Sequence, residues 1–195
     1  MIKDKGEEAL EKLVQDAKLF CTLLMKQTGK VPPTLFMHGM DGKAVFTPGE
    51  FTSVESKDEF ARAARLMCVA HGADATVFVS EAWMRMAVKD QKLDLSTPPS
   101  ESLDRQEILF IIGESREDHI FKAVPIIRTD NGKFVGFGET PEVRGDQTKG
   151  RFSHFLTEEI PNEDLRRKAK RILEEMGLVQ GKDHRREQGY GRTRF

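Results

Sequence analysis

Two short runs of strongly apolar residues constrain the fold of this chain more than any other feature. They cover residues 75–79 (Ala-Thr-Val-Phe-Val) and 108–112 (Ile-Leu-Phe-Ile-Ile). Runs of this length that are rich in β-branched and aromatic residues, with polar clusters on both sides, are typical of buried strands. The second run is apolar at every position, so it offers no polar face to water. We therefore expect residues 108–112 to form a central strand with a neighbour on each side.

The polar residues beside these two runs form the candidate site. If the two strands pair antiparallel, Glu81 and Trp83 at the end of the first meet the start of the second, where Asp104, Arg105 and Glu107 lie. A binding site would use Glu81 as an acid or base, Arg105 as an anion clamp and Trp83 as a stacking wall. The structural alternative is an ion pair of Arg105 with Glu81 or Glu107 that pins the loop, while Trp83 covers the core.

The rest of the chain supplies helices and further strands around this pair. Apolar residues recur at three and four over residues 7–28, which predicts an amphipathic helix ended by Gly29. A hairpin follows at residues 34–46. A second helix begins near a capping-box pattern of Ser56 and Glu59. A last helix begins after Pro161 with Asn162 as its cap and ends at Gly177. Pro125 lacks an N–H, so we expect an edge strand or a bulge there.

This order predicts an α+β fold: a mostly antiparallel sheet of about five to six strands flanked by three helices. Residues 1–178 are expected to form one such domain. The helix–ββ–helix–βββ–helix order resembles that of profilin-like and roadblock-like modules. The stretch from residue 84 to 104 is long for a connection inside a compact domain, and residues 138–153 show no periodicity. Both are expected to be loops.

Motifs that would indicate catalysis or a cofactor are missing from the sequence. It has no phosphate-binding glycine loop, no nucleophile elbow and no zinc-protease helix motif. The five histidines lack ligand spacing, and the two cysteines, Cys21 and Cys68, fall within helical apolar patterns. We therefore expect two reduced core thiols, no metal and no cofactor, and we favour a protein that is not an enzyme.

Charge and hydropathy limit the kinds of partner. The formal net charge is −1, with 31 basic and 32 acidic residues, so no overall field attracts nucleic acid or membrane. No apolar run is long enough to span a bilayer, and the first residues lack a signal-peptide core. The expected location is the cytoplasm. Residues 179–195 are basic and have little to bury, which predicts a disordered tail. It could contact nucleic acid through Arg185, Arg186, Arg192 and Arg194.

The pattern Ser80-Glu81-Ala82-Trp83, then Pro99-Ser100-Glu101 and Asp104-Arg105-Gln106-Glu107, resembles one found in uncharacterised bacterial and phage hypothetical proteins. This resemblance covers about a third of the chain and implies no activity.

Three hypotheses follow. The first is a cytoplasmic binding or regulatory module with its site at Glu81, Trp83 and Arg105. The second is a small hydrolase or transferase using Glu81 with a histidine supplied by the fold. The third is a nucleic-acid accessory protein acting through the last helix and tail. A homodimer is an open alternative for its assembly.

Overall fold

The computed structural model describes residues 5–40, 42–85, 96–139, 143–144 and 150–178. The elements in chain order are α1 (Lys5–Thr28), β1 (Thr34–Gly39), β2 (Gly42–Phe46), α2 (Val54–His71), β3 (Ala73–Met84), the 3-10 turn η1 (Pro99–Glu101), β4 (Gln106–Ser115), β5 (His119–Arg128), β6 (Phe134–Phe137), β7 (Val143–Arg144) and α3 (Glu163–Glu175). The α+β class predicted from the sequence is confirmed. The expected tail, with Arg185, Arg186, Arg192 and Arg194, lies outside the described residues.

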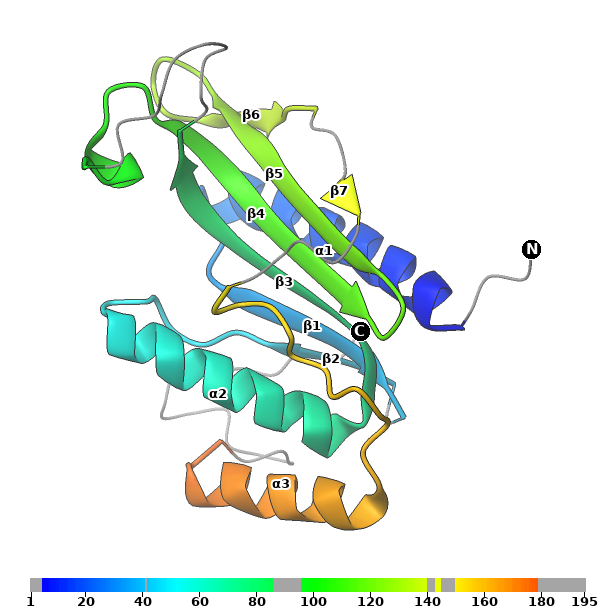
Figure 1. The fold of residues 1–195 in the computed structure, drawn as a ribbon. Coiled ribbons are helices and arrows are strands. Elements are labelled where there is room, and N and C mark those ends of the chain that lie inside the picture. Colours follow the sequence, from blue (N-terminus) through cyan, green and yellow to red (C-terminus); the bar gives the residue numbers. More distant parts are fainter. Residues whose placement is uncertain (1–4, 41, 86–95, 140–142, 145–149, 179–195) are drawn as a thin grey trace.

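The strands form one curled sheet in the order β2-β1-β3-β4-β5-β6, and neighbouring strands are antiparallel (Figure 1). Strand β4 lies between β3 and β5, so the prediction of a central strand at residues 108–112 is confirmed. Short β7 pairs with β5 at Ile120 and Phe121. The expectation of a loop without a strand at residues 138–153 was therefore wrong at residues 143 and 144. These two residues pair with the outer side of β5, which offers unpaired backbone groups.

Pro125 shows how β5 tolerates a proline. The outer side of β5 is paired only by the short strands β6 and β7. The Pro125 carbonyl accepts a hydrogen bond from the Gly138 N–H at 2.8 Å, so its missing donor also faces this thinly paired side. The proline therefore removes no bond from the ladder with β4.

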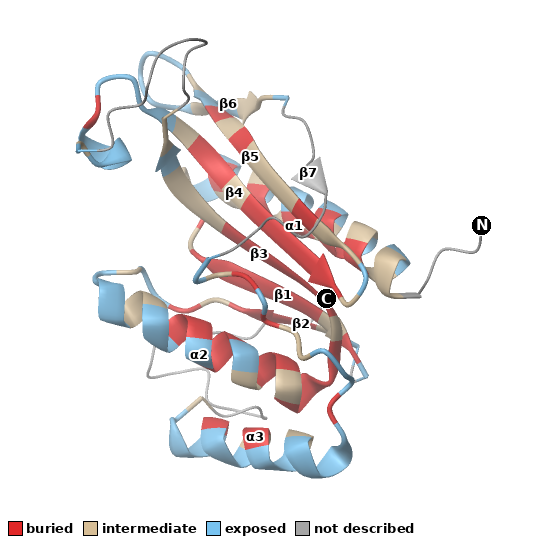
Figure 2. Ribbon diagram, viewed as in Figure 1, coloured by how far each residue is buried: buried red, intermediate tan, exposed pale blue. Residues whose placement is uncertain are grey.

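Helices cover the two faces of the sheet unequally. Helix α1 packs on one face, where Val77, Val79, Leu109 and Ile111 meet Leu13 and Ala17. Helix α2 covers the other face beside β1 and β3, around Phe60 and Phe78. Helix α3 packs on the far side of α2 (Figure 1). Buried residues run along the strands and the inner sides of α1 and α2, whereas α3 is mostly exposed (Figure 2).

Local sequence signals fix the helix ends. Gly29 and Gly177 have φ values of 73° and 72°, and each follows a helix as predicted. Asn162 caps α3 by accepting the Leu165 N–H at 2.9 Å. The capping box of α2 uses Ser53 and Ser56 rather than Ser56 and Glu59. That prediction was wrong by one turn, because a serine hydroxyl at the third helical position can bond back to the cap as a carboxylate does.

The two cysteines are buried and reduced, one in each layer. Cys21 belongs to the core under α1, and Cys68 belongs to the core under α2. Burial, followed by the charge of Glu81, raises the pKa of the Cys21 thiol to about 12. Burial likewise raises the pKa of Cys68 well above its ordinary value. No helix in the described part of the chain has the length and apolarity needed to cross a bilayer.

Candidate functional site

The ladder between β3 and β4 brings the predicted site residues to one end of the sheet. Trp83 lies opposite Glu107, and Glu81 lies opposite Leu109. We call this end the tip and define it by Glu81, Trp83, Leu103, Asp104, Arg105, Glu107 and Arg128. The antiparallel pairing expected from the sequence is present, so Glu81 and Trp83 do meet the start of β4.

Glu81 serves as an anchor for the chain that leaves α1. It lies on the α1 face of the sheet, in alternation with the buried Val77 and Val79. One of its oxygens accepts the Val31 N–H at 2.5 Å. Burial raises the pKa of Glu81, and the nearby Glu107 acts in the same direction. The Val31 N–H and the positive charges of Arg128 and Lys30 act against this rise.

Arg128, which the sequence analysis did not select, is the ionic partner at the tip. Its Nε and Nη2 atoms each donate to one oxygen of Glu107 at 2.7 Å, forming a two-point ion pair. The same Nη2 atom donates to the Gly29 carbonyl at 3.1 Å, just beyond the end of α1. The hydrogen bond with Glu107 is the main cause of the raised pKa of Arg128.

The expected ion pair of Arg105 with Glu81 or Glu107 is therefore wrong. Arg105 precedes the first residue of β4 and belongs to the turn before it, whereas the end of β5 brings Arg128 beside Glu107. The Arg105 guanidinium lies over the Trp83 ring, 4.4 Å from its centroid, and also donates to the Ser100 carbonyl. Trp83 is 42% exposed, so it does not act as a cover for the core.

The turn that leads into β4 is held in shape by polar contacts. Asp104 accepts hydrogen bonds from the Ser102 hydroxyl and, at 2.9 Å, from Arg85 Nε. These two contacts, with Ser102 first, lower the pKa of Asp104. Between Ser102 and Asp104, the Leu103 side chain is fully exposed. A pinned turn thus presents a large apolar side chain to solvent.

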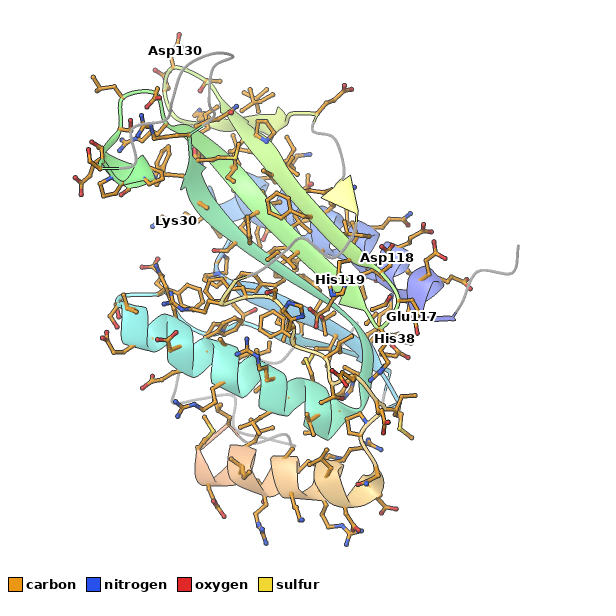
Figure 3. The ribbon with its side chains drawn as sticks, viewed as in Figure 1. Lys30, His38, Glu117, Asp118, His119 and Asp130 are labelled. Carbon is orange, nitrogen blue, oxygen red and sulfur yellow. The ribbon has the colours of Figure 1, made fainter. Side chains whose placement is uncertain are left out.

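The opposite end of the same ladder carries a second carboxylate that the sequence analysis did not select. Glu114 lies on β4 beside Thr76 and is only 2% exposed. Its two oxygens accept the N–H groups of His154 at 2.8 Å and Leu156 at 2.5 Å. Burial raises its pKa, while these two N–H groups and the nearby His119 and His154 oppose the rise. Figure 3 shows Asp118 and His119 at this end of β5, and Asp130 beyond the other end.

Residues 150–156, which we call the strap, are held at this end from both sides. On one side, Glu114 accepts two N–H groups of the strap. On the other side, the Arg65 guanidinium on α2 donates to three strap carbonyl oxygens, at distances of 3.1–3.2 Å. These oxygens belong to Arg151, Ser153 and His154. His154 adopts a left-handed conformation with φ of 57°. Phe152 and Phe155 pack near Phe78, at 4.7 Å and 6.2 Å between ring centroids. The strap is thus part of the scaffold.

The geometry limits what either carboxylate can do chemically. Among the described residues, no histidine makes a hydrogen bond or an ion pair with Glu81. His38 contacts Asp74, and His119 and His154 lie beside Glu114. The described residues contain no cluster of histidine, cysteine and acidic side chains suited to a metal ion. Two open clefts, of about 580 and 350 Å³, lie along α2 and α3.

Comparison of the chain with protein-family models, curated proteins and solved structures gives no significant match. The resemblances expected from the sequence therefore remain predictions. Two signals in the sequence could have identified the residues that the sequence analysis did not select. Glu114 follows an apolar strand as Glu81 does, and Arg128 ends a strand just before a turn. Neither signal names the partner, because pairing depends on the sheet order.

Proposed function

We propose that this protein is a binding module that recognises a protein partner through the tip. The observation that carries the proposal is the fully exposed Leu103, presented on a pinned turn two residues before Arg105, which lies over the Trp83 ring. Tryptophan and arginine are the residues most enriched at the energetic centres of protein interfaces. An exposed leucine on the same turn as Arg105 adds apolar area that a partner can remove from water.

The pinning of the turn supports recognition rather than stability. The contacts of Asp104 with Ser102 and Arg85, and of Arg105 with Ser100, fix backbone that has little core to cover. A turn that is already ordered loses less conformational entropy when it binds. Leu103 is fully exposed and Trp83 is 42% exposed, which favours a macromolecular surface over a small ligand.

Site-specific photo-crosslinking tests this proposal. A photoreactive amino acid replaces Leu103 in one variant and Leu19, an exposed leucine on α1, in a matched control. In cells that make the protein, we expect one defined adduct from position 103 and none of that mass from position 19. Trp83→Ala should abolish the adduct. With the captured partner purified, the same change should weaken binding about 30-fold, as expected for an interface centre.

The proposal fails if the adducts at positions 103 and 19 are the same, or if the adduct at 103 survives Trp83→Ala. The alternatives from the sequence give other results. A hydrolase or transferase using Glu81 would lose turnover on Glu81→Gln without any change in crosslinking. A nucleic-acid accessory protein acting through the last helix and tail would show salt-sensitive binding to nucleic acid that Trp83→Ala leaves intact.

A further inference from the structure

Helix α3 leaves part of its apolar surface uncovered. Only Ala169 and Leu173 of this helix are buried, and they pack against α2. Leu165, Ile172 and Met176 are 45%, 41% and 40% exposed. They are spaced by seven and four residues, so they form one stripe along the helix, spanning about 40° of its circumference. This stripe lies beside the contact with α2.

The solvent side of the stripe carries charges in an ordered pattern. Asp164, Lys168, Arg171 and Glu175 follow one another at intervals of four, three and four residues, so they form one row next to the stripe. Asp164 contacts Arg167 at 3.9 Å within the same helix. Lys168 and Glu175 have no ionic partner among the described residues of the chain.

We propose that α3 is the contact of a homodimer in which two copies pack their stripes antiparallel about a two-fold axis at Ile172. Such an axis places the charged row of one helix beside the same row of the other. Lys168 lies four residues before Ile172, and Glu175 lies three residues after it. Lys168 of each copy therefore meets Glu175 of the other, so the contact contains two equivalent ion pairs beside the apolar stripes.

The charge pattern favours a second copy over a lipid surface. Amphipathic helices that lie on anionic membranes carry basic residues along the polar side of their apolar face. Here the row beside the stripe begins and ends with acids, Asp164 and Glu175, which an anionic surface would repel. One helix of 13 residues covers less area than a standard interface of about 1,600 Å². We therefore expect a dimer that dissociates on dilution.

Sedimentation velocity of the full chain over a wide range of concentration is the first test. We expect reversible self-association that Ile172→Glu weakens at least about tenfold, because a charge would enter the apolar contact. Leu19→Glu on α1 is the matched control and should leave the association unchanged. Thermal melts of both variants at low concentration establish that they fold.

Charge exchange provides the more specific test. Lys168→Glu turns two attractions into two repulsions and should weaken the dimer by about tenfold. Combining it with Glu175→Lys should restore the wild-type association. Oxidation should link Ile172→Cys chains into covalent dimers but leave Leu165→Cys chains monomeric, since antiparallel packing separates those two residues by about 20 Å.

Three outcomes would overturn the proposal: a wild-type chain that is monomeric at every concentration, a double charge variant that associates no better than Lys168→Glu, or linking through position 165 instead of 172. Binding to anionic vesicles without self-association would assign the stripe to a membrane and would also overturn it. None of these outcomes bears on the tip, which lies on other elements.

Discussion

The two ends of the β3–β4 ladder share one kind of anchor but differ in how much of their surroundings is exposed to solvent. At each end a strand carboxylate accepts backbone N–H groups from a distant segment: Glu81 from Val31, and Glu114 from the strap. Around Glu114 the N–H groups of the strap are matched by this buried carboxylate, and its carbonyls are matched by the Arg65 guanidinium. Around Glu81 the ionic network lies on the α1 face, while Trp83 and Leu103 face solvent. Similar anchors can therefore leave one end closed as scaffold and the other end exposed to solvent.

The largest effect is expected at the closed end. Glu114→Ala removes the acceptor of two strap N–H groups in a buried position, so it should lower the free energy of unfolding by about 3 kcal/mol. Urea unfolding followed by circular dichroism measures this. Glu117→Ala, at an exposed glutamate in the adjacent turn, is the control and should change stability by less than about 0.5 kcal/mol. Equal losses in the two variants would show that Glu114 does not anchor the strap.

The ion pair at the tip should rank second. The Arg128 and Glu107 side chains are 22% and 20% exposed. Arg128→Ala leaves Glu107 without its partner and also removes the contact with the Gly29 carbonyl, so we expect a loss of about 2 kcal/mol. Changing both Arg128 and Glu107 to leucine should recover part of that loss, because no uncompensated charge remains. If Arg105→Ala costs as much as Arg128→Ala, our assignment of the ion pair is wrong.

The pH dependence of the free energy of unfolding should also differ between variants of Glu114 and Glu81. Because the folded-state pKa of Glu114 is raised, the folded protein binds this proton more tightly than the unfolded chain does. Stability from this group is therefore fully present below its ordinary pKa and is lost as the pH rises through the folded value. Glu114→Gln should remove this loss, so the variant should gain stability relative to the wild type as the pH rises above the ordinary glutamate pKa. Glu81→Gln should show a smaller effect in the same direction, because Glu81 is less buried. If the stability difference between each glutamine variant and the wild type does not change with pH, the raised pKa values are not its cause.

The smallest effects on folding belong to the residues proposed to bind. Leu103→Ala should change the free energy of unfolding by less than about 0.5 kcal/mol, because the side chain touches little in the folded state. Arg105→Ala should cost about 0.5–1 kcal/mol, the value of an exposed cation–π contact. Thermal melts check both. A large loss from either change would place these residues in the scaffold and weaken the case for the tip as a binding site.

The sequence was informative where local pattern determines structure. The apolar run at residues 108–112 predicted the central strand, and Gly29, Asn162 and Gly177 predicted helix ends. The sequence also predicted that Glu81 and Trp83 lie near the start of β4, because antiparallel pairing of successive strands is common. It failed for Arg128 and Glu114. Their partners, Glu107 and the strap, lie 21 and about 40 residues away along the chain, and only the packed sheet brings them together.

Because one cysteine lies in each layer, the reactivity of each thiol can report the opening of its own layer. A thiol must be ionised and accessible to react, and both groups are buried with raised pKa values. A thiol reagent should therefore modify Cys21 only when the α1 layer opens and Cys68 only when the α2 layer opens. Peptide mapping distinguishes the two sites, so the labelling rates report how often each face of one sheet becomes exposed. If the layers unfold together, the two rates will show the same dependence on denaturant.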